Sequence, residues 1–230
     1  MIDDVVVRII SLVPSVTETL SSWGHPPIAC TRFCERPDIE HVGGTKDPDV
    51  VRIVQLRPDL VVVDAEENRL EDYDALVGRG VNVFALHVRS LYEVDKSMTD
   101  LADRVGANWT RLALGDPRPA RARAFIPIWR RPWIALGTPT YGTSLLAHLG
   151  VANVFDAGER YPEVELADVV SRGADVVLAP SEPYPFTKRQ LPELEKIAPT
   201  LFVDGKDLFW WGNRTRDALS RLADSLVTLQ

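Results

Sequence analysis

Acidic and hydroxyl side chains follow two short apolar runs, residues 60–63 and 176–179, which lie far apart in the chain. Both runs are bounded by turn-forming residues, and the first is rich in β-branched ones, a pattern typical of strands buried on both faces. The loops at the carboxyl ends of parallel strands line the ligand crevice of an α/β sheet, so we expect both sets of polar residues to face one site. Those residues are Glu66, Glu67 and Asn68 after the first run, and Ser181, Glu182 and Tyr184 after the second.

These polar groups do not form a recognisable catalytic or metal-binding motif. The sequence has no Gly-x-Ser-x-Gly elbow, no His-Glu-x-x-His or paired-cysteine zinc spacing, and no glycine-rich phosphate loop after a strand. Glu66, Glu67 and Glu182 could act as acid or base, but nothing near them in the sequence distinguishes them from solvated loop charges. We therefore expect a protein that is not an enzyme and that requires no cofactor or metal of its own.

The two cysteines, Cys30 and Cys34, leave two interpretations open. Thiolates are ligands of soft metals and of the central ions of some cofactors, and Cys34 is the better candidate because it lies in an expected loop. A free cysteine is also commonly a small residue of the hydrophobic core.

Aromatic residues are concentrated at expected strand ends and in loops. A cleft lined by aromatic faces and a few fixed polar groups suits a large flat or amphipathic small molecule. The aromatic residues in such places are Phe33, Trp129, Tyr141, Tyr161, Tyr184, Phe186, Trp210 and Trp211.

Composition narrows the choice of partners. The chain of 230 residues carries a formal net charge of −7, which argues against nucleic acid or an anionic membrane surface. No apolar run is long enough for a membrane span, and no basic, apolar, small-residue signal opens the sequence. We expect a cytoplasmic protein, with export as the alternative if the natural N-terminus has been replaced.

The order of the expected elements predicts two α/β lobes with mainly parallel sheets. In the first, strands over 5–13, 28–33, 60–63 and 81–86 alternate with helices over 16–23, 49–56 and 70–78, with Ser15 or Thr17 as the first helix cap. Apolar residues at helical spacing then predict one helix over 91–114, long enough to connect two lobes. The predicted domains are residues 1–90, a connecting helix and linker over 91–122, and residues 123–230.

Motifs spread over nearly the whole chain resemble the class III periplasmic-binding-protein family, the helical-backbone metal receptors that bind vitamin B12 and iron siderophores. The first lobe carries RIISLVPSVTE at 8–18, GGTK at 43–46 and LRPDLVVV at 56–63. The second carries GVANVF at 150–155, YPEV at 161–164 and ADVVL at 174–178.

The resemblance implies two α/β lobes joined by a rigid backbone helix, with the ligand in the cleft between them. It further implies a corrinoid (cobalamin-like), haem-like or iron-siderophore ligand and an ABC transporter permease as a partner. The pocket positions that it carries over are Pro14, Ser15, Phe33, Asp64, Tyr141, Tyr161 and Trp210.

We therefore predict a non-catalytic solute-binding protein with bound cobalamin or iron chelate as its ligand. An alternative is a cytoplasmic cofactor-handling protein or enzyme on the same scaffold that uses Cys34 and Glu182; another is an interaction or sensing module. The predicted ligand-contacting residues are Pro14, Ser15, Phe33, Cys34, Asp64, Glu66, Tyr141, Tyr161, Glu182, Tyr184 and Trp210.

Overall fold

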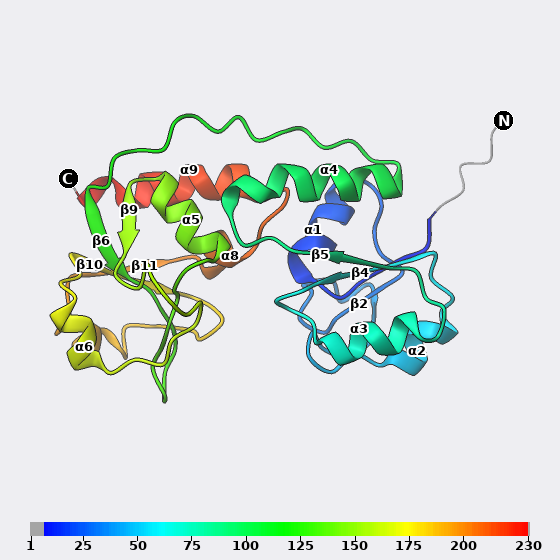
Figure 1. Ribbon diagram of the computed structural model, residues 1–230, viewed down its shortest axis with the longest axis horizontal. Helices are drawn as coiled ribbons and strands as arrows, with labels where there is room; N and C mark the ends of the chain where they lie inside the picture. Colours follow the sequence, from blue (N-terminus) through cyan, green and yellow to red (C-terminus); the bar gives the residue numbers. More distant parts are fainter. Residues whose placement is uncertain (1–6, 230) are drawn as a thin grey trace. The chain divides into compact units, whose positions relative to one another are not determined.

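The computed structural model describes residues 7–229, which divide into two compact units (Figure 1). The first unit runs up to Val88 and includes Val94–Arg111. The second comprises Arg89–Glu93 and the chain from Leu112 onward. The chain therefore leaves the first unit, returns to it and leaves it again.

A parallel five-stranded sheet forms the centre of the first unit. Its strands are β1 (Ile9–Ser11), β2 (Ala29–Cys30), β3 (Glu40–His41), β4 (Leu60–Asp64) and β5 (Val83–Leu86), in the order β3-β2-β1-β4-β5. Every residue of β1 and β4 is buried, as the continuous apolar runs predict for central parallel strands. The predicted mainly parallel α/β fold is confirmed for this unit.

Helices cover both faces of this sheet. Two of them, α2 (Val50–Gln55) and α3 (Leu70–Val77), lie together on one face, where Ile53 and Leu76 pack with alternate residues of β1 and β4 (Figure 1). The opposite face is covered by α1 (Pro14–Ser22).

The predicted side-chain cap of α1 is wrong. The N-cap residue is Val13, which makes no side-chain cap bond, and Ser15 lies inside the first turn, where its carbonyl oxygen accepts from Thr19 Oγ1 at 2.9 Å. The helix begins at Pro14 because proline has no N–H to leave unsatisfied and its φ angle already suits a helix.

The predicted helix over 91–114 is much shorter in the structure. A 3₁₀ turn, η1 (Leu91–Glu93), precedes α4 (Val94–Val105), which has 12 residues. Gly106 follows at φ 72° and the Ala107 N–H bonds to the Ala102 oxygen at 2.9 Å, the glycine-terminated pattern that closes helices. Trp109 continues the apolar spacing, yet its Nε1 donates to Asp95 Oδ1 at 2.8 Å, so the chain past Gly106 packs back against the helix.

The second unit contains a four-stranded sheet, again parallel throughout. Its strands are β6 (Ala122–Phe125), β9 (Val151–Asn153), β10 (Val176–Pro180) and β11 (Thr200–Val203), in the order β11-β10-β6-β9. The sequence did not predict β9 or, in the first unit, β3. Both are too short for a periodic pattern to stand out.

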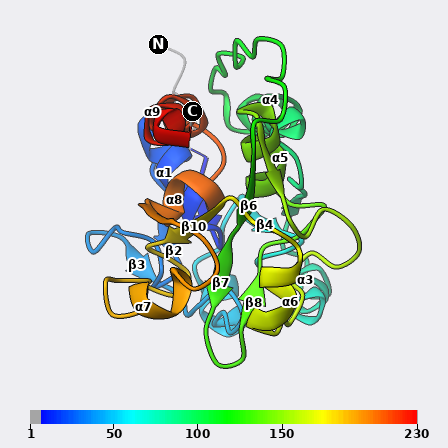
Figure 2. The ribbon, with the colours of Figure 1, turned by 90° about the vertical axis from the view of Figure 1, so that its left-hand side faces the viewer.

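A small antiparallel hairpin continues from β6. It pairs β7 (Pro127–Trp129) with β8 (Ile134–Ala135) (Figure 2). A bridge between Ile134 and Glu163 ties β8 to the segment that leads into α6.

The second unit has five helices among residues 112–229. Just before Trp210 and Trp211, which were expected in a loop, Gly205–Phe209 is helical, because the Asp204 side chain caps it by accepting from the Lys206 N–H at 3.0 Å. The helices are α5 (Tyr141–His148), α6 (Leu166–Ser171), α7 (Leu191–Leu194), α8 (Gly205–Phe209) and α9 (Thr215–Ser225), the last followed by η2 (Leu226–Leu229).

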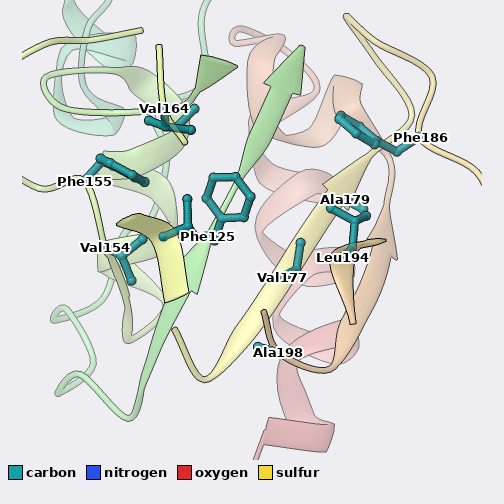
Figure 3. Packing of buried hydrophobic residues seen from close by; sticks show 11 residues of the cluster. Phe125, Val154, Phe155, Val164, Val177, Ala179, Phe186, Leu194 and Ala198 are labelled. Atoms are coloured by element: carbon teal, nitrogen blue, oxygen red, sulfur yellow. The ribbon is translucent and has the colours of Figure 1, made fainter. Parts of the chain in front are cut away.

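The core of the second unit is built around Phe125. In Figure 3 its ring lies between the side chains of Val164 and Val177, with Phe155 nearby at a ring-centroid distance of 6.2 Å. No helix of residues 7–229 combines the length and the apolar character needed to cross a membrane.

Candidate ligand-binding site

The loop between β1 and α1 places Pro14 and Ser15 at the carboxyl end of a central strand. Ser15 is buried and Pro14 is half-buried. Thr17 is the first residue of this turn whose N–H has a helical partner, the Val13 oxygen at 3.0 Å. The N–H groups of Ser15 and Val16 belong to the unpaired first turn of a helix, whose positive dipole end favours anionic groups.

Asp64 ends β4 and holds the following turn. Its Oδ1 accepts from the N–H groups of Glu66 and Glu67 at 2.9 and 3.2 Å, while Asn68 Oδ1 accepts from the Asp64 N–H at 2.9 Å. Asn68 Nδ2 also donates to the Thr45 oxygen at 2.9 Å, which ties this turn to the loop at 43–46. Asp64 is therefore a structural centre of the loops at this edge of the sheet.

The second carboxyl oxygen of Asp64 is unusual. The residue is only 1% exposed, and Oδ2 is buried without a hydrogen-bond partner. Burial raises the pKa of Asp64 to about 7, although the two backbone N–H groups at Oδ1 act in the opposite direction. The carboxyl group can therefore be neutral near physiological pH.

Glu66 lies at the tip of the same turn and is half-buried. Its backbone oxygen accepts from Lys46 Nζ at 2.6 Å, a second link between this turn and the loop at 43–46. Four of the predicted site residues, Pro14, Ser15, Asp64 and Glu66, thus lie at the carboxyl ends of the adjacent strands β1 and β4.

Phe33 and Cys34 follow β2 in a tight turn but differ sharply in exposure. Phe33 is 53% exposed, with the Arg32 guanidinium carbon 4.9 Å from its ring centroid. Cys34 is 4% exposed, and its Sγ lies 3.2 Å from Thr17 Oγ1 and 3.3 Å from Thr31 Oγ1. Phe33 is thus open to a ligand, whereas the Cys34 thiol is engaged locally.

In the second unit, Tyr141 begins α5 and is buried. It is 4% exposed, and its hydroxyl donates to Thr215 Oγ1 at 3.2 Å. Tyr161, by contrast, is 45% exposed, with the Arg160 guanidinium carbon 6.0 Å from its ring centroid. Tyr161 is therefore exposed to solvent, whereas the Tyr141 hydroxyl links α5 to the first residue of α9.

Glu182 and Tyr184 lie in the loop after β10, where it packs on the start of α8. Ser181 Oγ accepts from the Gly205 N–H at 2.9 Å, and a Cβ atom at position 205 would lie 2.6 Å from the Glu182 nitrogen. Tyr184 is half-buried against Trp129 and Phe186, at ring-centroid distances of 5.8 and 4.7 Å. This contact brings together aromatic residues from the hairpin and from the β10 loop.

Trp210 directly follows α8 and is flanked by two cations that were not among the predicted site residues. Lys206 Nζ lies 4.9 Å and the Arg214 guanidinium carbon 5.8 Å from the indole centroid. The sequence could have indicated both cations, because they lie four residues before and four residues after Trp210. Arg214 also contacts Asp207, a buried carboxylate that accepts from Arg221 as well.

The predicted residues are divided between the two units, and only some of their side chains are exposed. Among residues 7–229, no three His, Cys, Asp or Glu side chains group in a way that could hold a metal ion.

Comparisons with known proteins agree with this architecture. No family model matches the sequence. The vitamin B12-binding protein of Vibrio vulnificus is 24% identical over 183 residues, which is 71% of this chain and 67% of that protein. The vitamin B12-binding protein of Salmonella choleraesuis is 23% identical over 189 residues, covering 74% and 71% of the two chains.

Solved structures extend the similarity to almost the whole chain. The periplasmic vitamin B12-binding protein of Vibrio cholerae matches with a TM-score of 0.74 at 19% identity, covering 97% of both chains. A periplasmic haem-binding protein solved with two haems matches with a TM-score of 0.79 at 18% identity, over 97% of this chain and 98% of the other. The protein has the fold of these periplasmic binding proteins, and the resemblance seen in the sequence motifs is confirmed.

Two further predictions are decided by these matches. The relatives are named as binding proteins, in agreement with the prediction that the chain is not an enzyme. The prediction of a cytoplasmic location is wrong, because the matching solved proteins are periplasmic. The lack of a signal-like segment in the sequence was not sufficient ground for it.

Proposed function

We propose that this protein is a solute-binding protein that holds a corrinoid, haem-like or iron-siderophore ligand without transforming it and passes it to an ABC-type permease. The observation that carries the proposal is the shared fold along 97% of the chain with proteins that bind vitamin B12 and haem.

The residues that would meet such a ligand differ between the two units. In the first unit, the exposed ring of Phe33 offers apolar contact area, and the amino end of α1 offers N–H groups. In the second, Tyr161 and Trp210 offer ring faces, and Lys206 adds positive charge beside the indole. Flat macrocycles with carboxylate or amide edges need this combination of ring faces and polar or charged groups.

Three of the predicted contact residues, Tyr141, Cys34 and Asp64, are not proposed to touch the ligand directly. Tyr141 and Cys34 are buried and hydrogen-bonded within their own units, so we assign them supporting roles. Asp64 holds the turn after β4, and we propose that its effect on the ligand is exerted through Glu66 and the backbone of that turn.

Titration with defined ligands tests the proposal. Cyanocobalamin, haemin and a ferric siderophore are each added to the purified protein, and binding is followed by the change in ligand absorbance. We expect saturable binding of at least one of them with a micromolar or lower dissociation constant. Saturable binding of none of the three would refute the proposed ligand class.

A matched pair of variants tests the location. Phe33→Ala removes the exposed ring after β2, and Phe202→Ala removes a ring that is 41% exposed on β11 and lies outside the proposed contacts. We expect the first variant to weaken binding several-fold and the second to leave it unchanged. Equal affinities for the two variants would count against the proposed contact surface.

A further inference from the structure

A cavity of about 470 Å³ lies in the second unit, between α6 and the segment that precedes it. Sites for small molecules typically have volumes of about 300–1,000 Å³. The cavity is lined by residues within 155–172, and neither Tyr161 nor Trp210 is among them. It is therefore a feature of this unit that the proposed ligand contacts do not use.

The wall of the cavity that precedes α6 is held firmly in place. Three backbone hydrogen bonds of 2.7–2.9 Å join residues 160–164 to residues 133–137, around β8. The two segments pack closely, because a Cβ atom at Gly137 would overlap the Glu159 carbonyl oxygen. The other wall is tied to the chain after β9, where Arg172 Nη1 donates to the Val154 oxygen at 3.0 Å. A ligand would thus meet walls that are already ordered, which lowers the entropic cost of binding.

The inner end of the cavity is apolar. Phe155 and Val164, which line it, are only 6% and 8% exposed and belong to the core around Phe125 (Figure 3). The Arg172 guanidinium carbon lies 4.3 Å from the Phe155 ring centroid, so this cation is held at one side of the floor. Methylene groups of a ligand can therefore be removed from water against these two side chains.

The rim of the cavity is acidic. Glu159, Glu163 and Asp168 line it and are exposed, and within residues 7–229 their carboxylates have neither a hydrogen bond nor an ion pair. Arg172 is the one basic residue of the lining, so three carboxylates and one guanidinium leave two negative charges unbalanced. A ligand with two positive charges would relieve the repulsion among the carboxylates.

The spread of these carboxylates does not suit a single metal ion. In the described part of the chain, no three His, Cys, Asp or Glu side chains converge in a way that could hold one. The positive charges must therefore be separated within the ligand, and the apolar inner end favours an aliphatic spacer between them.

We propose that this cavity binds an aliphatic diamine or polyamine. Its ammonium groups donate to the acidic rim, since each has three N–H donors and no acceptor, and its methylene chain lies against Phe155 and Val164. Binding of the amine requires no corrinoid, haem or siderophore, so this inference and the proposed function can fail separately.

Isothermal titration calorimetry of the full chain at low ionic strength tests the proposal. The probes are 1,6-diaminohexane, hexylamine with a single charge, and 1,6-hexanediol with none. We expect one saturable site for the diamine, an affinity for hexylamine that is lower by roughly fivefold or more, and no binding of the diol. Added sodium chloride should weaken the diamine, because its partners are exposed carboxylates.

Three variants test the location. Glu163→Gln and Asp168→Asn each remove one carboxylate of the rim, and Glu195→Gln removes an exposed carboxylate outside the cavity as the matched control. Each rim variant should weaken diamine binding by roughly threefold or more, whereas the control should leave it unchanged. Thermal unfolding shows which variants are folded, and either rim variant is sufficient for the comparison.

Three results would overturn the proposal: equal affinities of the rim variants and the control, equal affinities for diamine and hexylamine, or no saturable binding at millimolar diamine. Displacement of the diamine by Mg²⁺ at matched ionic strength would also overturn it, because that result indicates diffuse attraction to an acidic chain.

Discussion

Replacement of Asp64 by asparagine should change how the stability of the protein depends on pH. The asparagine Oδ1 can still accept from the N–H groups of Glu66 and Glu67, so the turn after β4 keeps its anchoring bonds. The substitution removes a carboxyl group that is 1% exposed and has an unpartnered oxygen.

The magnitude follows from the raised pKa of Asp64. The native state binds this proton more tightly than the unfolded chain, so the contribution to stability is greatest at low pH and is lost as pH rises from 3.8 to about 7. At 1.36 kcal/mol per pH unit, the total loss is about 4 kcal/mol. Between pH 5 and pH 8 the wild type should lose about 3 kcal/mol relative to Asp64→Asn.

Urea unfolding at pH 5 and pH 8 measures this difference. The new amide places a buried donor without a partner, at a cost of about 1–3 kcal/mol, but this cost is the same at both pH values and cancels in the comparison. Asp74→Asn, which removes an exposed carboxylate from α3, controls for the loss of one negative charge. If wild type and Asp64→Asn show parallel stabilities at both pH values, the buried carboxyl group does not titrate as the structure implies.

Two further substitutions test the second unit. Trp210→Ala should weaken ligand binding at least tenfold, or about 1.4 kcal/mol, because it removes a ring face with Lys206 beside it; absorbance titration measures this, and unchanged affinity would remove Trp210 from the site. Gly205→Ala should lower the free energy of unfolding by about 1–3 kcal/mol, because its Cβ would lie 2.6 and 2.7 Å from backbone atoms of Glu182. Thermal unfolding measures this. An unchanged stability would mean that the loop after β10 moves aside without cost.

The sequence predicted the buried centre of each sheet well. Residues 60–63 and 176–179 are continuous apolar runs between turn formers, and β4 and β10 are buried along their whole length. Helix ends were harder to place, because apolar spacing continues through Gly106 although its left-handed backbone ends α4. The short helix α8 depends on one capping contact from Asp204, which composition alone does not reveal.

The sequence predicted where the candidate site residues lie relative to the strands and helices, but not which of their side chains are exposed. The order of elements correctly put Asp64, Phe33 and Tyr141 next to strand or helix ends. Whether such a side chain turns outward depends on tertiary contacts: the Tyr141 hydroxyl meets Thr215 in a distant helix, whereas the Phe33 ring meets only its neighbour Arg32 among the described contacts. A single sequence does not contain those distant pairings.

We propose that this protein holds a metal-chelate macrocycle or iron chelate without changing it. Native mass spectrometry of protein purified from its own host, with an absorption spectrum of the same sample, is the decisive experiment. We expect a complex heavier than the chain by the mass of an intact corrinoid, haem or siderophore, with the matching absorption bands. A chain that carries no such ligand and acquires none when cyanocobalamin, haemin and a ferric siderophore are supplied would contradict it.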